Sequence, residues 1–140
     1  MDELKKLTET GKYLFHGSAT NKIAILEPRQ AMSHGEPDGK PCIAASEQIE
    51  PAIFMAVLGS RHTGGWGKGN PPKGRYGFCI HKKDYKQARS ERWNGYVYVL
   101  PRASFEHFAA WEWRAFRPVE PIKSVKVEFS DLPAQIELTE

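Results

Sequence analysis

The sequence has little of what would place the chain outside the cell or across a membrane. It has two cysteines, Cys42 and Cys79, too few for a disulfide framework and too far apart for a CxxC motif. We expect both to be reduced core residues. No apolar run approaches the roughly 20 residues of a membrane span, and residues 1–6 lack the basic start and apolar stretch of a secretory signal. These absences predict a soluble, cytoplasmic protein with no membrane partner.

Length and composition predict one folded domain over residues 1–140. Of these residues, 40% are hydrophobic and 26% are charged, which excludes a disordered chain. A domain of this length buries enough surface to fold without disulfides or a structural metal. We find no internal repeat and no low-complexity segment.

Local patterns predict short helices mixed with short strands. Residues 2–10 fit an amphipathic helix with Leu4 and Leu7 inward, and residues 51–59 fit a helix that is apolar on all sides. Strands are expected in apolar runs at residues 13–15, 42–45, 75–80 and 95–100, and in shorter runs between 108 and 129. A turn or short helix should fill the charged stretch between 80 and 95. The mixture is typical of an α+β domain.

Residues 59–74 form the segment least suited to regular structure. They include six glycines and the pair Pro71-Pro72, so we expect a long irregular loop. Such loops in small domains often cover a functional site, although a plain surface loop has the same composition.

Positive charge is concentrated in residues 61–102. Ten Lys and Arg stand there against Asp84 and Glu91, a net charge of +8, while the rest of the chain carries −5. Aromatic residues alternate with the cations, among them Trp66, Tyr85 and Trp93. This mixture suits a nucleic-acid-binding face, and equally suits a solvated surface with its aromatic side chains packed inside.

Two polar residues in apolar surroundings are candidates for catalysis. His16 follows the apolar run at residues 13–15, so it is expected where a strand ends. Glu112 lies between Trp111 and Trp113. Each also has an ordinary structural interpretation, as a satisfied histidine and as a glutamate that strand alternation points outward.

Three segments resemble, in chain order, motifs of the ADP-ribosyltransferase superfamily, in its branch like the poly-ADP-ribose polymerases. Residues 14–18, Leu-Phe-His-Gly-Ser, resemble the first motif. Residues 42–46, Cys-Ile-Ala-Ala-Ser, followed by Ala52 and Phe54, resemble the second. Residues 112–116, Glu-Trp-Arg-Ala-Phe, resemble the third. The resemblance implies a split β-sheet core with a few short helices.

The resemblance also implies roles for single residues around bound NAD. Glu112 and His16 would be catalytic: Glu112 would hold the ribose 2′-hydroxyl and stabilise an oxocarbenium-like state, and His16 would orient the nucleotide. Gly17 would bind the nicotinamide carboxamide through its backbone. The remaining donor contacts would come from Ser18, Arg29, Ile43, Ser46 and Phe54. Arg29 would reach the pyrophosphate, and the loop at 59–74 would cover the donor.

Two positions depart from the family pattern. Ile43 stands where the family has a tyrosine that stacks on nicotinamide, and Ala110 stands where arginine-modifying members have Gln or Glu. The resemblance therefore implies transfer of ADP-ribose to a macromolecular acceptor, which is either a protein or a nucleic acid, at a group other than arginine. Small transferases of this kind occur as toxins and phage effectors. It implies NAD as co-substrate and no metal, and the other histidines lack zinc-site spacing.

The sequence is also compatible with two other functions. The chain could be a non-catalytic module that binds NAD, ADP-ribose or nucleic acid, which Ile43 and the basic stretch favour. It could also be an enzyme like the RNA 2′-phosphotransferase, which shares the fold and uses NAD. Release of nicotinamide would separate the binding module from either enzyme.

Overall fold

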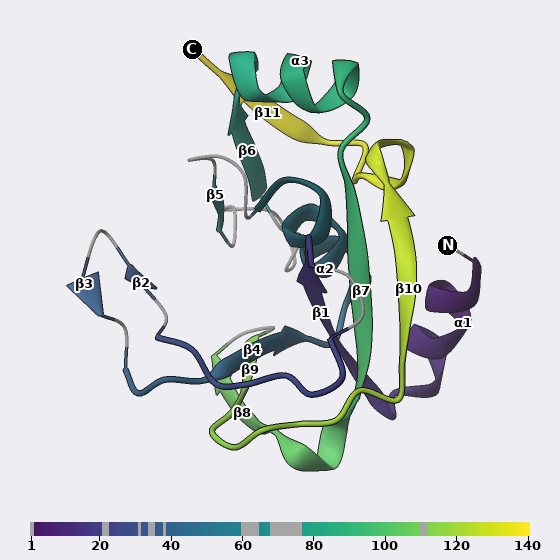
Figure 1. Ribbon diagram of the computed structural model, residues 1–140, viewed down its shortest axis with the longest axis vertical. Helices are drawn as coiled ribbons and strands as arrows, with labels where there is room; N and C mark the ends of the chain where they lie inside the picture. Colours follow the sequence, from purple (N-terminus) through teal and green to yellow (C-terminus); the bar gives the residue numbers. More distant parts are fainter. Residues whose placement is uncertain are drawn as a thin grey trace.

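The computed structural model describes residues 2–20, 23–30, 32–33, 36–37, 39–59, 65–67, 77–109 and 112–140. These residues form a mixed α+β fold with a mostly antiparallel main sheet, which confirms the fold class predicted from local patterns (Figure 1). No helix in these ranges is long and apolar enough to cross a membrane.

Six strands form the main sheet. They are β1 (Tyr13–Ser18), β4 (Ile43–Ser46), β7 (Asn94–Pro101), β8 (Glu106–Ala109), β9 (Glu112–Ala115) and β10 (Lys123–Glu128). Their order is β10-β7-β1-β4-β9-β8, and every neighbouring pair is antiparallel. β1 shares six pairs of Cα partners with β7 but only the pair Phe15 and Ser46 with β4. β1 and β4 therefore separate beyond that pair.

β1 is longer than the sequence predicts. Its last three residues, His16, Gly17 and Ser18, pair with β7 at Tyr98, Val97 and Tyr96. His16 is thus inside the strand, and its placement at a strand end was wrong. Pairing with β7 continues the strand past the apolar run, and no local pattern specifies that partner.

Three short helices accompany the sheet. α1 (Asp2–Thr10) is where the sequence predicts it, with Leu4 fully buried and Leu7 packed against the core. An ion pair between Glu3 and Lys123 joins α1 to β10, beside which it lies in Figure 1. α2 (Ile49–Phe54) continues as a π-helical turn to Gly59, and its buried residues surround the axis as predicted. α3 (Lys82–Ser90) fills the charged stretch.

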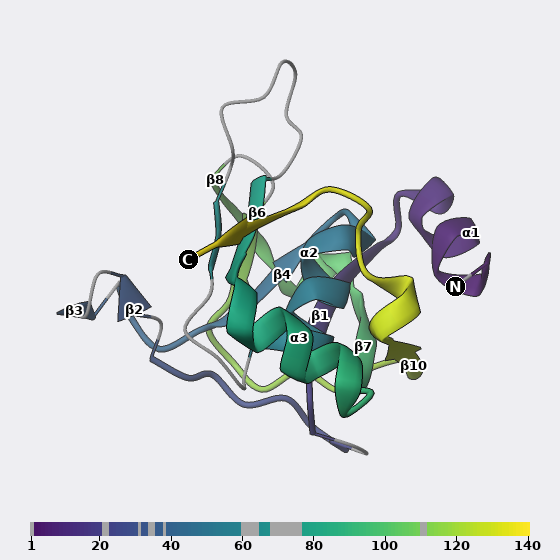
Figure 2. The ribbon, with the colours of Figure 1, turned by 90° about the horizontal axis from the view of Figure 1, so that it is seen from above.

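A smaller sheet lies next to α3, in the order β11-β6-β5. Its strands are β5 (Gly65–Gly67), β6 (Gly77–His81) and β11 (Ile136–Thr139), and β11 runs parallel to β6. A further hairpin pairs β2 (Met32–Ser33) with β3 (Glu36–Pro37). Figure 2 shows α3 alongside β6 and the C-terminal strand.

The expectation of no regular structure in residues 59–74 was wrong for β5. Gly65–Gly67 pairs antiparallel with Gly77–Cys79 of β6, the next strand along the chain, so backbone hydrogen bonds to β6 form a strand despite the glycines. The rest of that predicted loop, residues 60–64 and 68–74, lies outside the described residues.

Two hydrophobic clusters cover the two faces of the main sheet. The first joins β1 and β7 to α1, α2 and the smaller sheet, and includes Phe15, Phe54 and Phe78. The second, on the other face, includes Leu14 and Tyr98. Phe15 and Leu14 enter opposite clusters because successive side chains of a strand alternate between its faces.

The two cysteines differ in burial. Cys42 is buried, as expected of a core residue, whereas Cys79 is only partly buried.

Candidate functional site

A pocket beside β1 gathers four of the residues that the resemblance assigns to the donor. His16 and Ser18 are two residues apart on β1, so their side chains leave the strand on one face. With Arg29 and Ile43 they line a cavity of about 180 Å³. Arg29 reaches the cavity because its backbone pairs with Cys42, next to β4. Ligand cavities usually span about 300–1,000 Å³, so this one has room for part of a dinucleotide.

The imidazole of His16 bridges the place where β1 and β4 separate. Its Nδ1 lies 2.7 Å from the carbonyl oxygen of Ala44 on β4. A carbonyl oxygen only accepts hydrogen bonds, so we assign the proton to Nδ1. In the neutral ring Nε2 then carries a lone pair that can accept a hydrogen bond from a hydroxyl group.

The surroundings of His16 favour its neutral form. Burial lowers the pKa of His16, the hydrogen bond to Ala44 opposes this, and the positive charge of Arg29 lowers the pKa further. The net effect is a pKa below the usual 6.5. At pH 7 the ring is therefore an uncharged acceptor.

Arg29 supplies the positive charge of this pocket. It is exposed, and its guanidinium makes no hydrogen bond or ion pair with any residue that the structure describes. Glu27 also lines the pocket and is exposed. A guanidinium that has no partner among the described residues, at the edge of a small cavity, suits an anionic group such as a pyrophosphate.

Glu112 stands at the first position of β9, directly across from Ser46 of β4. Ser46 in turn is the cross-strand partner of Phe15, so the strands that carry His16 and Glu112 flank β4. Oε2 of Glu112 lies 2.7 Å from Nε of Arg114. Glu112 does not line the His16 pocket.

Sequence reasoning missed Arg114. Its side chain is only 3% exposed, and its guanidinium lies over the ring of Phe108, 3.6 Å from the ring centre. A charge buried this deeply needs its carboxylate partner. The signal that could have found it is the spacing: residues two apart on a strand share a face, and Arg114 follows Glu112 by two.

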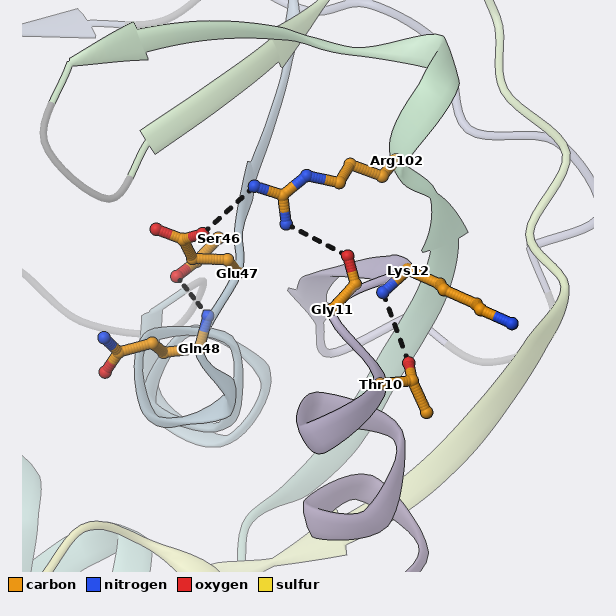
Figure 3. A network of polar contacts seen from close by, with 7 residues as sticks. All are labelled: Thr10, Gly11, Lys12, Ser46, Glu47, Gln48 and Arg102. Carbon is orange, nitrogen blue, oxygen red and sulfur yellow. Dashed lines mark hydrogen bonds and ion pairs between the residues drawn. The ribbon is translucent and has the colours of Figure 1, made fainter.

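Arg102 braces the strand that carries Glu112. Its guanidinium lies 4.3 Å from the ring centre of Trp113. It also pairs with Glu47 at 3.3 Å and donates to the carbonyl oxygen of Gly11 at 3.4 Å (Figure 3). One side chain thus connects β9 with the end of α1 and the turn before α2.

Three further residues assigned to the donor lie away from the His16 pocket. A Cβ on Gly17 would overlap a backbone carbonyl oxygen of α2, so the packing of β1 on α2 requires glycine there. Oγ of Ser46 accepts a hydrogen bond from the N–H of Gln48, 3.0 Å away, at the start of α2 (Figure 3). Phe54 is fully buried and stacks on an aromatic ring of β6, with centroids 5.1 Å apart.

The basic stretch keeps its cations outside and its described aromatic rings inside. On and after α3, exposed cations are Lys82, Lys83, Lys86, Arg89 and Arg92. Trp93 is 8% exposed, and Tyr85 packs edge-on against Phe129. The rings of Trp93 and Tyr85 therefore belong to the interior. Four other cations, Arg61, Lys68, Lys73 and Arg75, lie outside the described residues, as does Trp111 beside Glu112.

Within the described ranges, no three His, Cys, Asp or Glu side chains gather as a metal site requires. Comparisons of the chain with family models, curated proteins and solved structures gave no match.

Proposed function

We propose that the chain is an NAD-dependent ADP-ribosyltransferase that transfers ADP-ribose to a macromolecular acceptor and releases nicotinamide. The observation that carries the proposal is the adjacency of three strands. The segments that resemble the three family motifs are far apart in sequence, and they form β1, β4 and β9, which are consecutive in the sheet. Unrelated matches would have no reason to be neighbours.

The His16 pocket supports a role in holding the donor. Nε2 of His16 can accept a hydrogen bond from a ribose hydroxyl, since Nδ1 is held by Ala44. Arg29 at the same pocket would neutralise the pyrophosphate. A donor held this way would have to extend from the His16 pocket past β4 to bring its ribose to Glu112 on β9, because Glu112 does not line the pocket.

In the proposed reaction the bond between C1′ of the ribose and the nicotinamide nitrogen breaks, and its electron pair leaves with neutral nicotinamide. A nucleophile of the acceptor forms the new bond to C1′ and releases its proton to water. Positive charge develops on the sugar in between, so a nearby carboxylate lowers the barrier. Arg114 would orient Glu112 through Oε2 and leave Oε1 to accept from the 2′-hydroxyl.

The test is nicotinamide release from labelled NAD, with candidate protein, DNA and RNA acceptors. Glu112→Gln should lower turnover at least ~100-fold and change NAD affinity little, because the carboxylate acts mainly on the developing cation. The amide oxygen of Gln can still accept from Arg114, but the buried charge of Arg114 then lacks its carboxylate partner, so the comparison uses variant protein whose circular dichroism matches that of the native chain. Glu120→Gln, at an exposed position of the loop before β10, is the matched control.

Near-normal release by Glu112→Gln would refute the role of Glu112. Absence of release by the native chain with every acceptor would refute the transferase proposal.

The contacts of Glu112 favour a second candidate function. Its carboxylate is engaged by buried Arg114 and does not line the His16 pocket, and Ile43 occupies the position of the family's tyrosine. These features favour a module that binds ADP-ribose or NAD without cleaving it. Calorimetry that detects binding of ADP-ribose, together with no release of nicotinamide, would establish this function. An activity like that of RNA 2′-phosphotransferases would instead require removal of a 2′-phosphate from RNA.

A further inference from the structure

A second cavity, larger than the His16 pocket, lies between the end of α3, the start of β7 and the turn after β10. It measures about 470 Å³, within the usual range for ligand sites, and shares no lining residue with the His16 pocket. Its lining residues are Arg89, Arg92, Asn94, Glu128, Phe129 and Ser130. We call it the α3–β10 pocket.

Among the described residues the cations of the α3–β10 pocket have no hydrogen-bond or ion-pair partner, whereas its carboxylate is engaged. Neither the Arg89 nor the Arg92 guanidinium makes a hydrogen bond or ion pair with a described residue. The Glu128 side chain accepts from the backbone N–H of Asp131, and Asp131 accepts from that of Glu128. Glu91, close in sequence, accepts from Gln87 and Trp93. The pocket therefore presents two unneutralised guanidinium groups and a carboxylate held by the turn.

Arg92 occupies a backbone conformation that normally selects glycine. It follows the end of α3 with φ of 54°, and the N–H of Trp93 bonds back to Ala88 at 3.0 Å, as at many helix C-termini. A side chain in this left-handed region carries a backbone cost that glycine avoids. An arginine here, lining a cavity and without a partner for its guanidinium among the described residues, indicates that the guanidinium serves a ligand.

Further cations lead to the pocket along α3. Lys82, Lys86 and Arg89 are exposed and follow the spacing i, i+4, i+7, which sets them on one side of the helix. At 1.5 Å rise per residue, Lys82 and Arg89 are about 10 Å apart along the axis. Along the axis of a stacked strand, each nucleotide adds ~3.4 Å. The row therefore has the length of roughly three nucleotide steps of a strand.

We propose that the α3–β10 pocket and this row of cations bind the phosphodiester backbone of a single-stranded nucleic acid. Arg89 and Arg92 bind phosphates, and the half-buried ring of Phe129 contacts an unstacked base. A single strand can turn a base into a cavity, whereas the bases of a duplex are stacked away from it. The proposal concerns binding alone and does not depend on the transferase reaction.

The test titrates the full chain, without NAD, into fluorescent 12-residue oligonucleotides: single-stranded DNA, single-stranded RNA of the same sequence, and the DNA duplex. Arg92→Gly should weaken single-strand binding about tenfold, the effect of losing one charge-assisted contact. It should not lower the thermal midpoint, since glycine suits the left-handed position. Arg89→Ser should weaken binding similarly and reduce the log-log salt slope by about 0.7.

Arg117→Ser removes one exposed arginine that does not line the pocket and should leave binding unchanged. The proposal is overturned if the native chain binds neither single strand, or if Arg89→Ser and Arg92→Gly bind as Arg117→Ser does. Tighter binding of the duplex would overturn the assignment to a single strand. Equal displacement by polyglutamate of matching charge would overturn it in favour of an acidic protein. The DNA and RNA arms identify which single strand is preferred.

Discussion

His16 and Arg114 are two ionisable side chains of the main sheet. The surroundings of Arg114 stabilise its positive charge, whereas those of His16 favour the neutral form. The charge of Arg114 is balanced by the Glu112 carboxylate, whose Oε2 lies 2.7 Å from its Nε. His16 lies near the cation Arg29, which disfavours a charged imidazole ring. The neutral ring can still donate a hydrogen bond to the carbonyl oxygen of Ala44. The sheet therefore holds one fixed charge and one group whose charge state depends on pH.

The stability of the protein should fall on acidification because of His16. Its pKa is lowered in the folded state, so below the ordinary value of 6.5 the unfolded chain binds more protons than the native one. The free energy of unfolding should thus rise with pH from the lowered pKa up to about 6.5 and level off above it. One group contributes at most about 1.4 kcal/mol per pH unit. Urea unfolding between pH 5 and 8 measures this dependence.

The matched variant for this measurement is His16→Gln, whose amide can still donate to Ala44. It should show a shallower rise over the same pH range, with the curves differing most at the acid end. Identical slopes would mean that His16 has the same pKa in both states.

At the scale of elements, the contact between the main sheet and α2 depends on two glycines. A Cβ on Gly17 of β1 would overlap the carbonyl oxygen of Ala52, and one on Gly95 of β7 would overlap that of Ala56. Both strands therefore approach the backbone of α2 and its π-helical turn directly. Packing against α2 therefore requires glycine at position 17, independently of the nicotinamide-binding role that the resemblance assigns to Gly17.

Gly17→Ala should destabilise the protein strongly, by about 3 kcal/mol, because the obstructing atom is backbone and cannot rotate away. Gly11→Ala is the comparison: Gly11 has φ of 68° and nothing within 4 Å of the added Cβ. Its cost should be limited to the left-handed backbone, about 1 kcal/mol. Chemical denaturation of the two variants checks the difference. Equal costs would show that the sheet moves away from α2 easily.

At the scale of the whole molecule, one cluster joins the two sheets. Phe78 of β6 stacks on Phe54 of α2, and Ile136 of β11 packs against the same cluster that contains Phe15 of β1. The smaller sheet thus has no separate core among the described residues. The two sheets are expected to unfold together.

Phe78→Ala should lower the free energy of unfolding by about 3–5 kcal/mol, the usual cost of emptying a buried phenylalanine site. Circular dichroism and tryptophan fluorescence should report one coincident transition. Ile122→Ala, at a residue 53% exposed, should change the free energy little. Separate transitions for the two probes would show that the smaller sheet unfolds on its own.

Part of the candidate site could be read from the sequence, and part could not. The apolar run before His16 and the turn-rich segment around Arg29 are local features, and the structure joins both residues at one pocket. Arg114 was missed although its spacing from Glu112 was readable. The sequence predicts Phe54 as an apolar residue of a helix. It gives no sign that the ring stacks on Phe78 of β6, because that contact joins two separate elements.

The sequence by itself determined the elements whose signals are local. The helix at residues 2–10, the apolar α2 and the strands predicted at 42–45 and 95–100, which the structure contains as β4 and β7, follow from side-chain periodicity and from capping and turn residues within each segment.

Only the tertiary structure decided how far β1 extends, that Gly65–Gly67 is a strand, that β11 pairs parallel with β6, and which residues face one another across β1, β4 and β9. The pairing of β1 and of β11 depends on hydrogen bonds and register with partners tens of residues away, and no local window of sequence contains both partners. β6 is near β5 in the chain, but the glycines of β5 carry no side-chain alternation that would signal a strand.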